Sequence, residues 1–202
     1  METQANLIKE LRERTGAPIL QCKEALKACG QDIEKAITYL RERGIARAAK
    51  KIGRETKEGV VASYIHPGGK IGVLVEVNCE TDFVARNEEF NQFVKDITMH
   101  IAAANPLYLK REEVPEELIK KEEEIYTAQA KSLNKPEKVI QQIVKGQMDK
   151  FFSEVCLMEQ PFIKDEKITI KELLTSMIAK FGENIVIRRF SRFQLGEPLK
   201  TT

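Results

Sequence analysis

Residues 71–87 read Ile-Gly-Val-Leu-Val-Glu-Val-Asn-Cys-Glu-Thr-Asp-Phe-Val-Ala-Arg-Asn, and this stretch decides the fold of the region around it. Its first half alternates, which predicts a strand with one apolar face made by Ile71, Val73, Val75 and Val77. Asn87 is followed by two acidic residues, a pattern that is typical of a helix N-terminus. Between strand and helix lies Phe83 beside Asp82, an apolar ring on a short connection that is well placed to enter another protein.

The residues on either side of this stretch predict its partners in the fold. A second alternating segment comes before it, and Pro67-Gly-Gly69 supplies a tight turn, so residues 59–79 are predicted to form a β-hairpin. Pairing through this turn sets His66 opposite Ile71. After the strand, an apolar stripe at helical spacing predicts a helix over 88–104.

The C-terminal half predicts a helical hairpin and a further strand. Two amphipathic segments within 116–155 flank a turn at Asn134-Lys-Pro136, and this helical hairpin either projects as a coiled-coil arm or packs along the domain. Ile168-Thr-Ile170 is expected to begin a helical stretch that covers 171–180, and the β-branched and aromatic segment 184–193 reads as a third strand. The order of these elements fits an α+β fold, in which a three-stranded antiparallel sheet carries helices on one face.

The N-terminal quarter predicts a separate small module. Residues 1–45 contain three short apolar stripes, which indicate three helices, the last capped by Asp32 and ending at Gly44. Residues 46–57 are rich in Lys and Arg, and we interpret them as a basic linker that is helical at its start. The alternative is a basic contact with an acidic partner or with RNA. The α+β core is assigned to 58–202.

Composition argues against several functional classes. The chain has 202 residues, of which 42% are hydrophobic and 32% are charged, with a net charge of +2. This balance gives no electrostatic argument for a nucleic acid or an anionic membrane, so no direct nucleic-acid partner is expected. No apolar run reaches the ~18 residues of a membrane span, and the N-terminal segment lacks the apolar core of a secretory signal. We therefore expect no membrane partner and a cytoplasmic location.

Catalytic chemistry finds little support in the sequence. If His66 pairs with Ile71, Cys79 lies ~26 Å further along the strand, so these two side chains cannot form a nucleophile–base pair within one subunit. The four cysteines form no CxxC, and the glycine-rich and metal-ligating motifs of common enzymes are absent. We expect no catalytic residue, no cofactor and no metal site, and we interpret the cysteines as small buried apolar residues.

Several motifs together resemble one known family. Thr81-Asp82-Phe83-Val84, preceded by Glu76-Val-Asn-Cys79, resembles the signature of the elongation factor Ts family, the guanine-nucleotide exchange factors of bacterial translation. Further family-like segments follow the family order: Leu7-Ile-Lys-Glu-Leu-Arg-Glu-Arg-Thr-Gly-Ala-Pro18, Cys22-Lys-Glu-Ala-Leu26, Gln160-Pro-Phe162 and Gly182-Glu-Asn-Ile-Val-Ile-Arg188. The resemblance covers nearly the whole chain.

The resemblance implies a function without bond chemistry. It implies that the protein binds elongation factor Tu (EF-Tu) in its GDP state and promotes GDP release, and that the N-terminal helices form a ubiquitin-associated-like module. Asp82 and Phe83 would act as a wedge that disturbs the Mg²⁺ and phosphate site of EF-Tu, while Thr81 and Val84 shape the turn. The alternative is local: Thr81 or Asp82 caps a short helix, and Phe83 fills the nearby core.

The resemblance also implies secondary contacts and an assembly. It places Arg12, Ile19 and Leu20 against the nucleotide domain of EF-Tu, and His66 near its nucleotide side. Neighbours on a helix point about 100° apart, so one of Ile19 and Leu20 can face the small core; alternatively, both are core residues, and His66 only caps its turn. Longer family members carry two copies of the core, whereas this chain has room for one. It therefore resembles the short form, and a homodimer is predicted in which the third strand offers an edge to a partner sheet.

Overall fold

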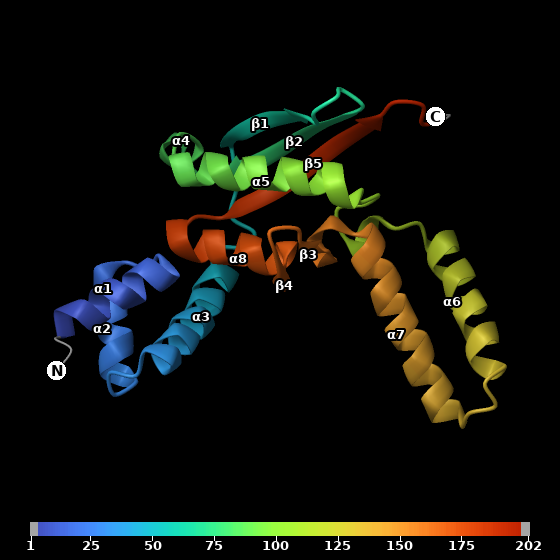
Figure 1. Ribbon diagram of the computed structural model, residues 1–202, viewed down its shortest axis with the longest axis horizontal. Coiled ribbons are helices and arrows are strands. Elements are labelled where there is room, and N and C mark those ends of the chain that lie inside the picture. The colour runs from blue at the N-terminus through green and yellow to red at the C-terminus, as the bar shows by residue number, and fades with distance from the viewer. Residues whose placement is uncertain (1–3, 199–202) are drawn as a thin grey trace. The chain divides into compact units, whose positions relative to one another are not determined.

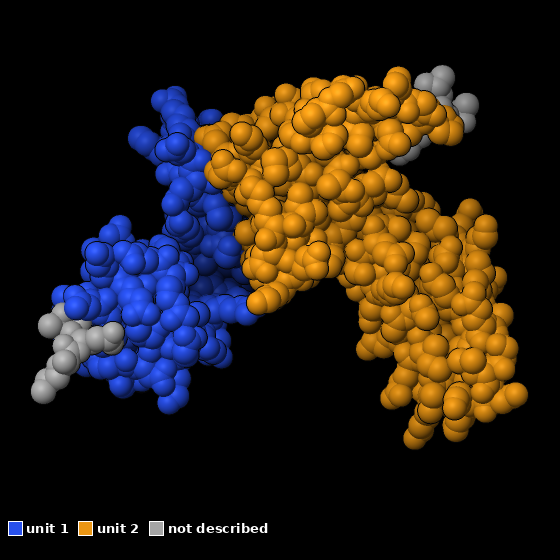
Figure 2. Space-filling view, in the orientation of Figure 1, with its two compact units in different colours: residues 1–59, 78–90, 174–186 blue, residues 60–77, 91–173, 187–202 orange. Residues whose placement is uncertain are grey.

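The computed structural model describes residues 4–198. These residues form two compact units that interleave along the chain (Figure 2). The first unit takes its residues from the segment that ends at 59, from 78–90 and from 174–186. The second takes them from 60–77, 91–173 and the segment that begins at 187. The predicted division at 45 and 57 stays a prediction.

The N-terminal part of the first unit is a module of three helices, as predicted. They are α1 (Gln4–Thr15), α2 (Ile19–Ala28) and α3 (Ile33–Ala49). Asp32 caps α3, because its side chain accepts a hydrogen bond from the Lys35 N–H at 3.0 Å. The buried side chains of the module form one small core: Leu11, Cys22, Ala25, Leu26, Ala36 and Leu40.

The prediction that the third helix ends at Gly44 is wrong, because α3 continues to Ala49. Gly44 does not have the positive φ of a glycine that terminates a helix. A Cβ at this position would lie 3.3 Å from the Cβ of Ala179, so the glycine permits a close approach of the helix α8 (Ile170–Phe181). A helix C-terminus and a close contact between two helices both favour glycine, so the sequence alone does not distinguish the two.

The sheet has the order β1-β2-β5, with β1 at Glu58–Ile65, β2 at Ile71–Cys79 and β5 at Ile185–Gln194 (Figure 1). The His66 N–H donates to the Ile71 carbonyl at 2.9 Å, which confirms the predicted hairpin pairing. Antiparallel pairing of β5 with β2 follows from two contacts. Leu195 N–H donates to the Lys70 carbonyl at 2.9 Å, and the Arg189 side chain bonds Glu76 at 2.7 Å, so positions descend along β5 as they ascend along β2.

One face of the sheet is buried and the other faces water. Val73, Val75 and Val77 are at most 2% exposed, while Leu74 between them is 49% exposed. Helix α5 (Glu88–Ala104) runs along one face of the sheet (Figure 1). Its buried side chains form the predicted stripe: Phe90, Phe93, Val94, Ile97 and Ile101. The predicted α+β fold is therefore confirmed.

The second unit also contains the predicted helical hairpin, α6 (Glu116–Lys131) and α7 (Glu137–Val155). It projects away from the sheet (Figure 1). Of the two arrangements that the sequence left open, the structure therefore has the projecting arm. Ala130, Ile140 and Val144 form a small core within the arm. At its base the Arg111 guanidinium lies 4.4 Å from the centre of the Phe152 ring, bonds Asp149 at 3.0 Å and also bonds Glu159. This contact joins the arm to the turn η2 (Leu157–Glu159).

The predicted helical stretch 171–180 is confirmed as α8, but the expectation that it begins with Ile168 and Thr169 is wrong, because these two residues belong to a strand. Residues Asp165–Thr169 form β4, which pairs with β3 (Pro161–Phe162), and α8 spans Ile170–Phe181. Thr169 and Glu172 build a capping box: the Thr169 hydroxyl accepts from the Glu172 N–H at 3.2 Å, and Glu172 accepts from the Thr169 N–H at 2.9 Å. Because Thr169 is both the last residue of β4 and the N-cap of this box, α8 begins at the next residue, Ile170. Among residues 4–198, no helix has both the length and the apolar composition needed to cross a bilayer.

Candidate functional site

The segment that resembles a family signature forms a single helical turn, α4 (Asp82–Ala85). Thr81 is its N-cap, with extended φ and ψ of −126° and 156°, and its hydroxyl accepts from the Val84 N–H at 3.5 Å. The turn closes through backbone bonds from Ala85 to Thr81 and from Arg86 to Asp82, at 3.2 and 3.0 Å. Of the local alternative, in which Thr81 or Asp82 caps a short helix and Phe83 fills the core, the capping part is therefore confirmed, with Thr81 as the cap.

Phe83 points away from the protein and Val84 points into it. The Phe83 side chain is 83% exposed, whereas Val84 and Ala85 are each 8% exposed. Successive helical residues differ in direction by about 100°, so burying Val84 turns Phe83 outward. Phe83 does not fill the local core. Within residues 4–198 it is the most exposed large apolar side chain.

Carboxylates from distant segments hold the base of α4. Glu183 accepts two hydrogen bonds from Thr81, one from the hydroxyl at 2.7 Å and one from the N–H at 3.1 Å. Glu80 accepts from the Asn184 N–H at 2.6 Å and contacts the Arg54 guanidinium at 3.5 Å. Asn184 is 3% exposed, and its side-chain amide donates to the Arg54 carbonyl at 2.8 Å. The sequence analysis singled out 182–188 as a family-like segment and 184–193 as a strand, and neither pattern predicts this role.

Cys79 contributes a protonated thiol to the same network. It is fully buried, and its Sγ donates to the Thr81 carbonyl at 3.2 Å. Burial, with a smaller contribution from the Glu183 charge, raises the pKa of the Cys79 thiol to about 11. At neutral pH the group is a hydrogen-bond donor and a poor nucleophile. Cys22 and Cys156 are likewise buried and Cys29 is partly buried, so the interpretation as small buried residues holds for three of the four.

Asp82 makes a weak local ion pair. Its carboxylate lies 3.1 Å from the Arg86 guanidinium, and the two side chains are 44% and 81% exposed. Pairs of this kind contribute about 0–1 kcal/mol, because water screens them. The carboxylate can therefore exchange Arg86 for another donor at small cost.

The secondary residues lie on other elements. Ile19 and Leu20 begin α2 and are 57% and 67% exposed, so neither is a core residue and both face solvent. Arg12 lies exposed on α1. His66 follows β1 in the other compact unit, where its Nδ1 lies 3.1 Å from the Tyr64 hydroxyl. The structure thus brings residues 81–84 into one turn and exposes the Ile19–Leu20 pair.

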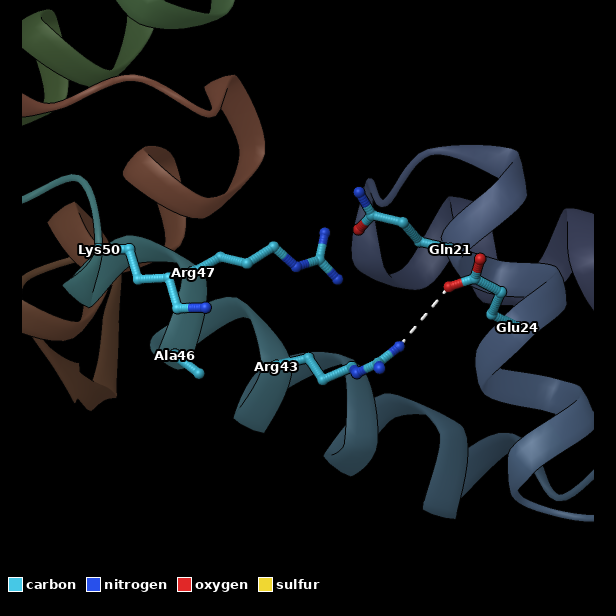
Figure 3. Close-up of a pocket in the computed structure, with 6 residues that line it drawn as sticks. All are labelled: Gln21, Glu24, Arg43, Ala46, Arg47 and Lys50. Carbon is cyan, nitrogen blue, oxygen red and sulfur yellow. Dashed lines mark ion pairs between the residues drawn. The ribbon is translucent and has the colours of Figure 1, made fainter.

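A basic hollow between α2 and α3 is a feature that the sequence analysis did not identify. Its volume is about 400 Å³, and it is lined by Gln21, Glu24, Arg43, Ala46, Arg47 and Lys50. Figure 3 shows Arg47 extending from α3 toward Gln21, while Arg43 forms an ion pair with Glu24 at 3.6 Å. Arg43 and Arg47 stand four residues apart on α3 and Lys50 directly follows it, a spacing that could have signalled the hollow from sequence. The three side chains offer donors to a carboxylate or a phosphate.

No group of three or more His, Cys, Asp or Glu side chains within residues 4–198 has an arrangement that could hold a metal ion.

His100 is fully buried in a structural network. Its Nε2 lies 3.0 Å from the Gln160 Oε1, and its Nδ1 accepts from the Ile163 N–H at 3.3 Å. Both ring nitrogens are occupied, and burial lowers the pKa of His100.

Comparisons with known proteins identify the family. The sequence model of the family described as Elongation factor TS matches residues 4–197. An elongation factor Ts from Carboxydothermus hydrogenoformans is 60% identical over 96% of this chain and 90% of that protein. One from Thermodesulfovibrio yellowstonii is 57% identical over 98% of both chains.

The chain belongs to the elongation factor Ts family. The resemblance of its motifs is thereby confirmed, and the protein is a translation elongation factor. Other relatives of similar length point the same way: the elongation factor Ts from Caldanaerobacter subterraneus subsp. tengcongensis is 60% identical over 97% of this chain and 98% of that protein. The family-like segment at 81–84 coincides with the exposed turn α4.

Proposed function

We propose that this protein is a guanine-nucleotide exchange factor for EF-Tu. It binds the GDP form of EF-Tu, inserts Phe83 with Asp82 beside it, and displaces the groups that hold Mg²⁺ and the phosphates, so that GDP leaves. The observation that supports this proposal most directly is the 83% exposure of Phe83 on a capped helical turn. The protein makes and breaks no covalent bond in this role, needs no cofactor, and acts in the cytoplasm, where translation takes place.

Linkage explains how binding alone releases a nucleotide. A factor that binds the nucleotide-free GTPase more tightly than the GDP form weakens GDP binding by the same ratio. Mg²⁺ requires near-ideal octahedral geometry, so a small displacement of its ligands and waters is sufficient to weaken it. Burial of Phe83 in a pocket that exists only in the displaced state supplies about 1.5–3 kcal/mol toward that state.

Asp82 and the N-terminal residues complete the proposed interface. Asp82 exchanges its exposed pair with Arg86 for donors of EF-Tu and fixes the angle at which Phe83 enters. Ile19 and Leu20 supply apolar area to a second contact, with Arg12 at its polar border. Neither apolar side chain is needed for the core of the three-helix module, which is consistent with selection for binding.

Release of a fluorescent GDP analogue from EF-Tu tests the proposal. EF-Tu is loaded with the labelled nucleotide and chased with excess unlabelled GDP, with and without this protein. We expect acceleration by substoichiometric amounts of the protein, because an exchange factor turns over. If a complex forms but the release rate does not change, the protein is a binding partner without exchange activity and the proposal fails.

A further inference from the structure

We propose that Glu183 is a positioning residue for exchange: its carboxylate holds Thr81 and thereby sets the direction in which Phe83 projects. This inference rests on the proposed function, because it assumes that Phe83 acts on EF-Tu. Glu183 itself stands outside α4, at the turn between α8 and β5, and bonds Thr81, the residue that enters α4.

The contact between Glu183 and Thr81 fixes an orientation as well as a distance. The two carboxylate oxygens accept from two different donors of Thr81, Oε1 from the hydroxyl at 2.7 Å and Oε2 from the N–H at 3.1 Å. Such two-point contacts restrict rotation, and hydrogen bonds to an ionised acceptor are stronger than neutral ones. Thr81 is the residue that enters α4, so its orientation determines that of the turn.

The neighbouring residues repeat the contact in the opposite direction. Glu80, one residue before Thr81, accepts from the N–H of Asn184, one residue after Glu183, at 2.6 Å. Residues 80–81 and residues 183–184 thus each contribute one carboxylate that accepts and one backbone N–H that donates. Asn184 is in turn bonded to the Arg54 carbonyl at 2.8 Å, so the clamp is anchored in a third segment.

The wedge needs such a clamp because α4 is too short to hold itself. It has four residues, whereas isolated helices below about 12–15 residues are marginal in water. Its capping bond from the Val84 N–H to the Thr81 hydroxyl is long, at 3.5 Å. The same hydroxyl donates to Glu183 at 2.7 Å, and donation of its proton makes its oxygen a better acceptor for the Val84 N–H.

A second threonine–glutamate pair supplies a matched control. Glu172 accepts from the Thr169 N–H at 2.9 Å and from its hydroxyl at 3.3 Å, which is the same chemistry at the start of α8. It belongs to the capping box of an ordinary helix and carries no exposed ring. Loss of either glutamate removes a hydroxyl and an N–H hydrogen bond from a threonine, although the bonds of Glu172 are more exposed. Only the loss of Glu183 should leave the direction of Phe83 unfixed.

The test compares Glu183→Ala with Glu172→Ala in the GDP-release assay on the full-length protein, each titrated to saturation. We expect Glu183→Ala to lower the saturating rate about tenfold, the loss typical of hydrogen bonds to a charged group. The half-saturating concentration should change little, because the remaining contacts with EF-Tu are kept. Glu172→Ala should keep the wild-type saturating rate, and equal rates for the two variants would overturn the inference.

A double variant separates positioning from general destabilisation. If Glu183 acts through Phe83, then Glu183→Ala has no further effect on the rate once Phe83→Ala is present. A purely structural role would lower the rate by the same factor in both backgrounds. If Glu183→Ala does not fold, Thr81→Ser and Thr81→Val replace it: the serine keeps the hydroxyl and should retain the rate, the valine should lose it, and equal rates overturn the inference.

The outcomes also distinguish the inference from the function on which it rests. A wild-type rate of GDP release for Phe83→Ala would contradict the role of Phe83 as a wedge, and with it the proposed mechanism. A large loss with Phe83→Ala, combined with a wild-type rate for Glu183→Ala, removes only the positioning role of Glu183.

Discussion

Replacement of Phe83 by alanine is the most direct perturbation of the proposed mechanism. The ring is 83% exposed in the free protein, so its removal opens no cavity. Surface substitutions of this kind usually change the free energy of unfolding by less than about 0.5 kcal/mol. Any large loss of exchange activity in Phe83→Ala is therefore attributable to the complex with EF-Tu and not to the fold of this protein.

The size of the expected loss follows from the exposed area. Burial of a Phe side chain contributes about 1.5–3 kcal/mol, and almost all of that is still available to a partner, because so little of the ring is covered in the free protein. With about 1.4 kcal/mol for each factor of ten, removal of the ring should slow GDP release about 10- to 150-fold. The loss should appear in the saturating rate, because the ring favours the displaced state of EF-Tu over its ground state.

The assay is stopped-flow release of labelled GDP at saturating concentrations of this protein. Phe193→Ala is the matched control, because Phe193 is also an exposed phenylalanine, at 69%, but lies on β5 in the other compact unit. We expect this control to release GDP at the wild-type rate. A Phe83→Ala protein that is folded and as fast as wild type would refute the assignment of the ring as a wedge.

Three further predictions follow from the same structure. Leu20→Ser should weaken binding to EF-Tu several-fold without loss of thermal stability, as measured by calorimetry. Leu26→Ala, at a fully buried position, should instead lower the free energy of unfolding by about 2–5 kcal/mol. Equal effects of the two variants on stability would contradict the assignment of Leu20 to the surface and Leu26 to the core. Burial lowers the pKa of His100 in the folded state, so the unfolded chain binds the proton more readily and stability should fall as pH drops below about 6.5. Urea unfolding at pH 7.5 and 5.5 should show a smaller loss for His100→Gln than for wild type, and parallel losses would exclude His100 as the cause. The predicted homodimer should sediment at about twice the chain mass of 23.0 kDa at micromolar concentration; a mass near one chain at all dilutions would count against it.

Local sequence rules predicted the parts of the fold that local chemistry determines. Alternation in residues 71–77 and the Pro67-Gly-Gly69 turn fixed the hairpin and its register, because a shift by one residue would turn the valines toward water. The apolar stripe of α5 gave both its bounds and its buried face. The exposed position of Phe83 was one of two alternatives that the sequence left open, because a short turn can also bury successive side chains, as Val84 and Ala85 show.

The features that the sequence missed depend on contacts between distant segments. The role of Gly44 depends on Ala179, and the clamp on Thr81 depends on Glu183, 102 residues away. A glycine at the end of an apolar stripe and a glutamate in a turn have ordinary local explanations, so no window of sequence reveals the contact. The strand β4 was missed for a similar reason, because its pairing with β3 outweighs the helical pattern that follows it.

Exposure and rigidity together make Phe83 suited to shift a partner's equilibrium. If the ring were packed in its own protein, its withdrawal would cost about as much as its insertion gains, and no differential binding energy would remain. If the ring were exposed on a mobile loop, part of the gain would be lost to ordering the loop on binding. Here the ring is exposed, and the bonds from Thr81 to Glu183 and from Asn184 to Glu80 order the turn when the protein folds. In the proposed mechanism nearly the whole burial energy of the ring would be left to oppose GDP, so we expect the saturating rate, and not the affinity, to be the quantity most sensitive to this site.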